Sequence, residues 1–181
     1  MIESTKTKRF QAVVLPHLNS AFNLACWLTH SRQDAEDVVQ EAYLRAFKFF
    51  DGFHGEDGRA WLLTIVRNTF YNWYQENHPQ QQGPLFDEEL HSFEQTGAAA
   101  LARADDNPEH LLMQKDSEQL LQRALGALPL EFREVMVMRE LEELSYKQIA
   151  AIVGIPIGTV MSRLGRGRRL LAQILAPADR E

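Results

Sequence analysis

The sequence predicts an all-α fold in which two small helical domains are joined by a flexible linker. Apolar residues recur with the period of a helix along most of the chain, and few segments alternate with the period of a β-strand. A length of 181 residues suits one large domain or two small ones. Helical periodicity fades after residue 78 and returns at residue 108, so the predicted parts are residues 1–78, 79–107 and 108–181.

Three helices are expected in the first domain. The first spans about residues 10–29 and includes Pro16 near its start, and the last spans about residues 59–76. Between them, residues 33–50 place apolar side chains on one helical stripe, and Ser31 can cap this helix. The stripe consists of Ala35, Val39, Ala42, Ala46 and Phe49.

A change in composition separates the two predicted domains. Residues 78–107 read HPQQQGPLFDEELHSFEQTGAAALARADDN and are rich in Pro, Gly, Gln and acidic residues. A segment of this kind lacks the periodic apolar surface that a packed core requires. We therefore expect a linker that is at least partly disordered when the protein is free.

The second domain is expected to contain four helices. Asn107 is a possible N-cap with Pro108 at the first helical position, and this helix ends near Leu128-Pro129. Another helix spans about residues 131–141, and the last two helices follow it.

The last two predicted helices have the pattern of a helix-turn-helix. Ser145 and Gln148 form a capping box that starts the first of them. Gly154 can adopt the left-handed conformation that ends a helix, and Pro156 suits the start of the next one. Ala150 is small enough for the two helices to approach closely. We expect their shared core to consist of Ile149, Val153, Ile155, Val160 and Leu164.

Basic residues are segregated at this motif. The formal net charge of −6 argues by itself against nucleic-acid binding, yet residues 156–178 contain no acidic residue. The second helix would present a polar and basic face to the major groove of DNA. That face comprises Thr159, Ser162, Arg163 and Arg166, and Arg168 and Arg169 extend it. A helical hairpin with merely solvated arginines is the alternative, but the cap, the glycine turn, the core pattern and the acid-free stretch together favour DNA binding.

Two helices of the first domain carry unusual faces. The helix that contains DAEDVVQEAYLRAFK has an acidic outer face, which would repel DNA and should therefore meet water or a protein. Leu44 is an apolar side chain within this face, and it favours a surface that docks on a protein. Residues 59–77 carry aromatic side chains on more than one face. Some of these belong to the core, whereas those beside Arg67, Asn68 and Asn72 could stack on unpaired bases.

Over nearly its whole length the chain resembles the extracytoplasmic-function (ECF) sigma factors of bacterial RNA polymerase. The matching segments, in order, are DAEDVVQEAYLRAF, AWLLTIVRNTFYNW, NPEHLL and LPLEFREVMVMRELEELSYKQIAAIVGIPIGTVMSRLGRGRRLL. The resemblance implies that the first domain is sigma region 2 and the second is sigma region 4. It also implies promoter-specific transcription initiation, with core RNA polymerase and promoter DNA as partners and an anti-sigma factor as the expected regulator.

The resemblance assigns roles to individual residues. Region 2 would dock on the clamp coiled coil of the polymerase, while the flap is a second expected contact. Asn68 would lie where the family captures a flipped base of the −10 element. Region 4 would place its second helix in the major groove of the −35 element. The residues that would bind the polymerase are Asp37, Gln40, Glu41 and Leu44. Those that would bind the −10 element are Arg67, Asn68, Asn72 and Trp73. Those that would bind the −35 element are Thr159, Ser162, Arg163 and Arg166, with Arg139 and Tyr146 as backbone-side contacts.

The chain departs from the family pattern at several positions. Gly165 and Gly167 weaken the last helix by about 1 kcal/mol each relative to Ala. The stretch QENHPQQQ stands where a basic run often follows region 2, so upstream DNA contacts there should be weak.

The sequence does not predict an enzyme. It contains no phosphate loop, no HExxH and no GxSxG motif, and its six histidines are scattered, so no metal, cofactor or small-molecule substrate is expected.

Cys26 is the only cysteine, which excludes an intramolecular disulfide, and its apolar neighbours predict a buried thiol. The opening MIESTKTKRF has no apolar signal segment, and no apolar run approaches membrane-span length, so a cytoplasmic protein is expected.

Two other classes of function remain open at this level. A stand-alone helix-turn-helix regulator would bind duplex DNA without polymerase, as a dimer on a palindrome. A protein-interaction module that captures a regulator would bind a protein partner and support no transcription. Gel shifts without polymerase and transcription with core polymerase separate these classes from a sigma factor.

Overall fold

The computed structural model describes residues 2–79 and 108–176, and for residues 2, 3 and 108–113 it describes the backbone alone. Every regular element in these two ranges is a helix, which confirms the all-α prediction. The elements are α1 (Ile2–Val14), η1 (Leu15–His17), α2 (Leu18–Thr29), α3 (Arg32–Phe49), η2 (Phe50–Gly52), α4 (Gly58–Asn77), α5 (Pro108–Gly126), α6 (Leu130–Met136), η3 (Val137–Leu141), α7 (Tyr146–Val153) and α8 (Ile157–Leu175).

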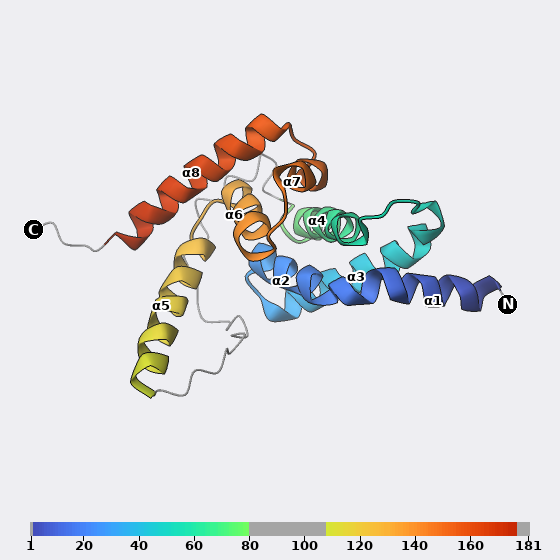
Figure 1. Ribbon diagram of the computed structural model, residues 1–181, viewed down its shortest axis with the longest axis horizontal. Coiled ribbons are helices and arrows are strands. Elements are labelled where there is room, and N and C mark those ends of the chain that lie inside the picture. Colours follow the sequence, from blue (N-terminus) through green and yellow to red (C-terminus); the bar gives the residue numbers. More distant parts are fainter. Residues whose placement is uncertain (1, 80–107, 177–181) are drawn as a thin grey trace, which may run out of the picture.

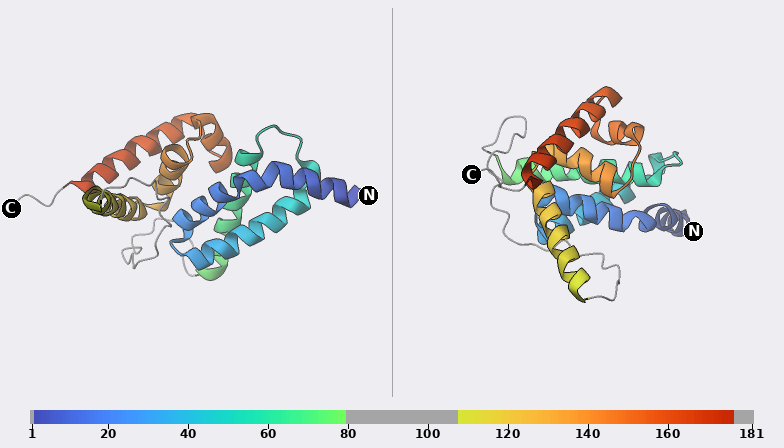
Figure 2. Two further views of the ribbon diagram at one scale, coloured as in Figure 1. Left: turned by 60° about the horizontal axis from the view of Figure 1, so that its bottom comes forward. Right: turned by 60° about the vertical axis from the view of Figure 1, so that its left-hand side comes forward.

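The helices form two bodies that lie against each other. Residues 2–79, the N-terminal half, pack α2, α3 and α4 together, and α1 extends from them (Figure 1). Residues 108–176, the C-terminal half, pack α8 across α5, α6 and α7. The halves meet where α6 lies against α2 and α7 lies against α4 (Figure 2). Helix α1 and the end of α8 point to opposite ends of the molecule (Figure 1).

The predicted helix over residues 10–29 is wrong in two respects. Helix α1 already begins at Ile2, and the chain bends through the short 3₁₀ turn of η1 before α2. Pro16 lies in that turn, and it breaks the helix because its ring displaces the preceding turn and it has no N–H to donate. Phe10 anchors the unexpected helix: its ring is 1% exposed and meets three aromatic rings of α3 and η2 edge-on.

The start of α3 follows the prediction, and the start of α4 adds a second cap. Ser31 Oγ accepts the backbone N–H of Asp34 at 3.3 Å. Asp57 caps α4 in the same way, because its Oδ1 accepts the N–H of Ala60 at 2.9 Å. The N-terminal core beneath these helices is apolar and includes Leu24, Leu28, Val38, Leu63 and Val66. Cys26 at its edge is only half-buried, and burial raises the pKa of its thiol.

The predicted helix over residues 131–141 contains an irregularity that the sequence did not indicate. Helix α6 is α-helical only to Met136, and residues 137–141 then form a π turn. Glu142 closes this turn because its N–H donates to Val137 O at 3.1 Å. A π turn accommodates one more residue than an α turn, so it rotates the chain that follows it.

The helix-turn-helix forms as predicted. Ser145 and Gln148 complete the reciprocal capping box at the start of α7. Gly154 ends α7 with φ 75°, a left-handed conformation that glycine adopts without strain. Helix α8 then begins after Pro156 and is bent by 101° relative to α7. Of the predicted core residues, Ile149, Val153, Val160 and Leu164 are buried, whereas Ile155 is only partly buried against them.

Gly167 has a packing role that its helix propensity does not reveal. A Cβ at this position would lie 3.0 Å from Met136 Cγ and 3.5 Å from Phe132 Cβ. The missing side chain therefore lets α8 approach α6 closely. Gly165 differs, because a Cβ there would meet nothing within 4 Å.

Within residues 2–79 and 108–176, no single helix is long and apolar enough to cross a membrane.

Candidate nucleic-acid interface

The first turns of α8 present the side chains that the sequence assigns to duplex DNA. Val160 and Leu164 are buried against the rest of the domain, which turns Ser162 and Arg166 outward into solvent. Ser162 Oγ donates to Thr159 O at 3.1 Å, so the hydroxyl is held close to the helix surface. Thr159 itself is half-buried. This end of α8 can offer hydroxyl and guanidinium donors to a groove or to phosphates.

Arg139 and Tyr146, which the sequence assigns to the DNA backbone, contact each other within the helix-turn-helix. Arg139 Nη1 donates to Leu144 O at 2.9 Å, and its guanidinium lies 4.8 Å from the centre of the Tyr146 ring. Arg168 of α8 pairs with Glu140 at 2.9 Å, and this hydrogen bond raises the pKa of Arg168. The π turn, the start of α7 and the middle of α8 are thereby connected by polar contacts.

Helix α4 carries the residues that the sequence assigns to unpaired bases. Asn68 and Asn72 are both exposed and lie one turn apart, hence on one face of the helix. Trp73 is half-buried, with its ring 6.1 Å from that of Phe70. Arg67 lies elsewhere: its side chain is only 16% exposed and points to the C-terminal half.

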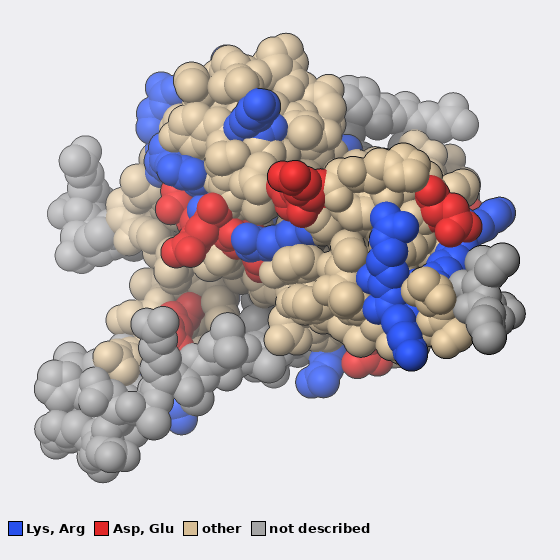
Figure 3. Space-filling view, turned by 45° about the vertical axis from the view of Figure 1, so that its right-hand side comes forward, with Lys and Arg blue, Asp and Glu red and all other residues tan. Residues whose placement is uncertain are grey.

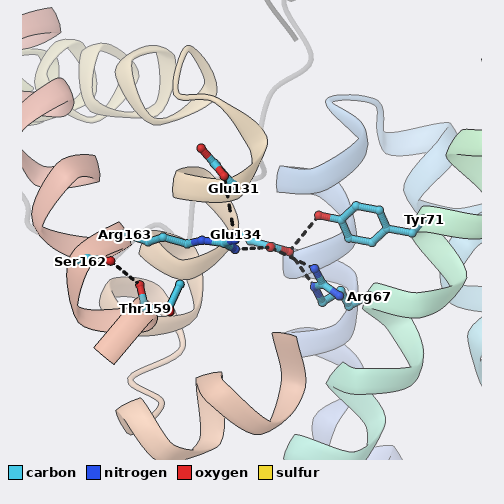
Figure 4. Close-up of polar contacts among 7 residues, drawn as sticks. All are labelled: Arg67, Tyr71, Glu131, Glu134, Thr159, Ser162 and Arg163. Atoms are coloured by element: carbon cyan, nitrogen blue, oxygen red, sulfur yellow. Dashed lines mark hydrogen bonds and ion pairs between the residues drawn. The ribbon is translucent and has the colours of Figure 1, made fainter. Parts of the chain in front are cut away.

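The partner of Arg67 is Glu134, whose side chain is 1% exposed (Figure 4). Arg67 Nε lies 2.8 Å from Glu134 Oε2, and Nη2 lies 3.1 Å from Oε1, so the pair is bidentate. Burial alone would lower the pKa of Arg67, but the hydrogen bonds and charge of Glu134 outweigh that effect and raise it. Tyr71 Oη donates to Glu134 Oε2 at 3.2 Å, and burial together with the nearby carboxylate raises the pKa of this phenol.

Arg163 of α8 approaches the same carboxylate from the other side (Figure 4). Its guanidinium lies 3.9 Å from Glu134 Oε1 and 3.9 Å from Glu131 Oε2. These separations are ion-pair distances rather than hydrogen bonds. One buried carboxylate therefore lies between a residue assigned to the −10 element and a residue assigned to the −35 element.

A second ionic contact joins the halves near the start of α4. Arg59 Nη2 lies 2.7 Å from Glu142 Oε2 and also donates to the backbone oxygen of Glu142. Asn23 Nδ2 donates to Glu142 Oε1 at 2.8 Å. Gln148 Nε2 donates to Asp57 Oδ2 at 2.7 Å, which connects the capping box of α7 to the cap of α4.

The outer face of α3 is open to solvent. Asp37, Gln40 and Glu41 are exposed, and Leu44, one turn further along the helix, is 66% exposed. Glu41 forms an ion pair with Arg45 at 2.8 Å, one turn along the helix. Basic and acidic side chains also alternate over the face of the molecule in Figure 3, so that face has no single sign of charge.

Known proteins match both halves of this structure. Residues 13–78 match the family model for sigma-70 region 2, and residues 118–171 match the model for sigma-70 region 4. The sequence is also 32% identical over 181 residues to the ECF RNA polymerase sigma-E factor of Escherichia coli, covering 99% of this chain and 93% of that relative. The chain belongs to the ECF RNA polymerase sigma factors.

Further relatives agree with this sigma-factor assignment. The ECF RNA polymerase sigma factor SigE of Mycolicibacterium smegmatis is 32% identical over 170 residues, which are 93% of this chain and 62% of that relative. Among solved structures, the sigma factor RpoE in complex with the anti-sigma factor NepR from Bartonella quintana superposes with a TM-score of 0.71 at 29% identity. That match covers 96% of this chain and 99% of the other.

The sigma factor contains functional candidates that its sequence did not single out. Glu134 and Glu142 lie in a helical region rich in charge, where a carboxylate is usually solvated. Their partners, Arg67 and Arg59, are remote in the sequence. Only the packing of region 4 against region 2 identifies these pairs.

Proposed function

We propose that this sigma factor binds core RNA polymerase and directs initiation at promoters by reading a −35 element with α8 and a −10 element with α4. The observation that carries this proposal is the start of α8, the second helix of a helix-turn-helix, where Ser162 and Arg166 are exposed. Second helices of such motifs enter the major groove with their first turns. The match of residues 118–171 to sigma-70 region 4 supports the same role.

In this proposal the −35 contacts divide by chemistry. Arg166 has the reach and charge to contact guanine edges or phosphates, while Thr159 and Ser162 offer hydroxyls. Arg163 joins them when it leaves Glu134. Tyr146 and Arg139 lie at the start of the motif, where they support the backbone-side approach.

The −10 element is assigned to the exposed face of α4. Asn68 and Asn72 can hydrogen-bond the edges of unpaired bases, and Trp73 beside them offers a ring for stacking. Arg67 would contribute its charge to this strand once it is released from Glu134. Extrusion of a base costs a few kcal/mol, which these contacts must recover.

The polymerase surface is assigned to α3. Asp37, Gln40, Glu41 and Leu44 together form an exposed acidic patch with one apolar side chain at its C-terminal end. Such a patch suits a basic protein surface better than DNA. The family resemblance names that surface as the clamp coiled coil of the polymerase, with the flap as the expected partner of region 4.

Anti-sigma control and a cytoplasmic location complete the proposal. The sigma factor RpoE is bound to an anti-sigma factor in a structure that matches 96% of this chain. A comparable regulator would cover the DNA-binding and polymerase-binding surfaces of this protein. A pull-down with this protein from the native host would identify that regulator.

Run-off transcription tests the proposed function. The template is a promoter recovered by sequencing DNA that co-purifies with the protein, and core polymerase is assayed with and without the wild-type chain. Asn68→Ala and Arg166→Ala should each lower the specific transcript about tenfold, since a lost base contact is worth about 1–3 kcal/mol. Asn19→Ala and Arg123→Ala remove the same residue types at exposed sites on α2 and α5 and should leave the transcript intact.

Two results would contradict the proposal. One is the absence of any transcript with the wild-type protein and core polymerase. The other is a specific gel shift of that promoter by the protein alone, at the affinity of a stand-alone regulator, with Asn68→Ala behaving like its control.

A further inference from the structure

Two large apolar side chains are exposed on the first turns of α8, beside the polar side chains assigned to the −35 element. Met161 is 52% exposed and Ile157 is 42% exposed, whereas Val160 and Leu164 on the same turns are fully buried. We propose that Ile157 and Met161 contact the C5-methyl groups of thymines in the −35 element and thereby select thymine at those positions. This inference deepens the proposed function and rests on it.

The positions of the side chains around α8 divide its outward face into an apolar and a polar side. Ile157 and Met161 lie one turn apart and are rotated by roughly 40° from each other, so they are neighbours on the helix surface. Ser162 lies roughly 100° and Arg166 roughly 140° from Met161 around the helix, and both are exposed. A groove that encloses these turns would therefore meet apolar groups on one side of the helix and hydrogen-bond donors on the other.

Glycines occupy the outward positions between the two sides. Gly158 and Gly165 fall between Met161 and Ser162 around the helix, and a Cβ at either glycine would meet nothing within 4 Å. Packing within the described residues therefore requires neither of them. Without side chains at these positions the backbone of α8 can approach the base edges closely, as glycine permits where a backbone must come near a ligand. Thymine methyl groups in the major groove then come within reach of Ile157 and Met161.

Thymine is the base whose major-groove edge suits apolar side chains. It presents a C5-methyl group there, whereas guanine, adenine and cytosine present hydrogen-bonding groups. Isoleucine has no hydrogen-bonding side-chain group and the methionine thioether is only a weak acceptor, so neither can satisfy a polar base edge. A polar edge buried against them would lose its water without gaining a partner, which is unfavourable. Ile157 and Met161 therefore favour thymine both by contact and by exclusion of the other bases.

A protein surface is the alternative occupant of this apolar pair, and the surrounding residues favour DNA. Protein docking is typical of large continuous apolar patches. This pair is instead bordered by two glycines, by Ser162 and by Arg166, and residues 156–178 contain no acidic residue. The charge beside the pair is thus complementary to phosphate, and the pair continues the face that is assigned to duplex DNA.

Removal of single methyl groups from the promoter tests the inference. Each thymidine in the −35 element of a promoter recovered with the protein is replaced in turn by deoxyuridine, which lacks only the C5-methyl group. Each duplex competes with one fluorescein-labelled promoter fragment for the holoenzyme, and its affinity is compared with that of the unmodified duplex. Ile157→Ala/Met161→Ala removes both apolar side chains, and Met161→Leu retains one of similar size. Ile174→Ala is the matched control, because Ile174 is a 45% exposed apolar residue near the other end of α8.

We expect deoxyuridine to lower the affinity of the wild-type holoenzyme about fourfold at the thymidines that the pair contacts, because burial of one methyl group contributes about this factor. Ile157→Ala/Met161→Ala should bind the thymidine and deoxyuridine duplexes equally. Met161→Leu and Ile174→Ala should keep the fourfold difference.

The inference is overturned by any of three results. The first is a −35 element without an A·T pair, or one in which deoxyuridine changes no affinity. The second is a deoxyuridine effect that persists in Ile157→Ala/Met161→Ala. The third is weaker assembly of this double variant with core polymerase at an unchanged thymidine preference, which would assign the pair to a protein surface. Failure of the proposed function is distinct, because its sign is the absence of a run-off transcript from the unmodified template.

Discussion

At the scale of single residues, His30 shows how the packing of the two halves changes a side chain's chemistry. It ends α2 in the left-handed conformation, with φ 57°, and is half-buried. Burial, together with the charge of Arg133 in the other half, lowers the pKa of His30 to about 4 from an ordinary value of 6.5. The folded chain therefore keeps this imidazole neutral where the unfolded chain would already have protonated it.

A pH dependence of stability follows from this shift. Between pH 6.5 and 4 the unfolded chain binds a proton at His30 that the folded chain does not, so the free energy of unfolding should fall as the pH falls. The slope from this residue is at most about 1.4 kcal/mol per pH unit. Urea titrations at pH 6.5 and 5.5 should give a smaller difference for His30→Asn than for the wild-type protein. Asn is chosen because it tolerates a positive φ.

His54→Asn provides the control for this measurement, because His54 lies exposed in the loop before α4. It should retain the wild-type slope. If His30→Asn and His54→Asn lose stability with pH equally, the burial of His30 is not the cause.

At the scale of the element, α8 combines two glycines with opposite roles. Gly165 faces open space, so it lowers the stability of the helix and makes no close contact within the protein possible in exchange. Gly167, in contrast, lets α8 pack closely on Met136 and Phe132 of α6. The sequence predicts only the first effect, because propensity is local whereas the approach of α6 depends on the fold. The same reasoning explains why the capping box at Ser145 was predictable and the π turn after Met136 was not.

Two alanine substitutions in α8 should therefore differ in sign. Gly165→Ala should raise the free energy of unfolding by about 0.5–1 kcal/mol through helix propensity. Gly167→Ala gains the same propensity but drives a methyl group into buried Met136, which costs about 1–3 kcal/mol, so it should destabilise the protein by about 1 kcal/mol. Denaturant titration of both variants measures the difference. Equal stabilisation by the two substitutions would show that α8 and α6 are not in close contact at Gly167.

At the scale of the whole molecule, the sequence predicts the parts better than their arrangement. Short-range rules yielded the caps of α3 and α7, the Gly154 turn and the core of the helix-turn-helix, because each depends on residues a few positions apart. The bend at Pro16 is absent from the predicted helix, although a proline inside a helical pattern is a known signal for one. The contacts of Glu134 and Glu142 depend on how region 4 lies on region 2, and no local pattern encodes that.

The packing of the two halves also determines which candidate site residues are exposed. The residue pattern identified Asn68, Asn72, Ser162 and Arg166 as polar groups on α4 and α8, and all four are exposed. It also selected Arg67 and Arg163, which the structure places beside Glu134 rather than on the open surface. Their assignment to DNA remains a prediction about the opened molecule.

Tethered cleavage shows whether the two halves of one chain contact separate elements of the same promoter on the polymerase. An iron chelate that cleaves DNA by hydroxyl radicals is attached to Arg169→Cys on α8 or to Gln75→Cys on α4, both exposed sites, in a Cys26→Ser background. With core polymerase bound, the chelate on α8 should cut around the −35 element and the chelate on α4 around the −10 element. Cleavage of one shared site from both positions, or symmetric cleavage of a palindrome without polymerase, would contradict the account.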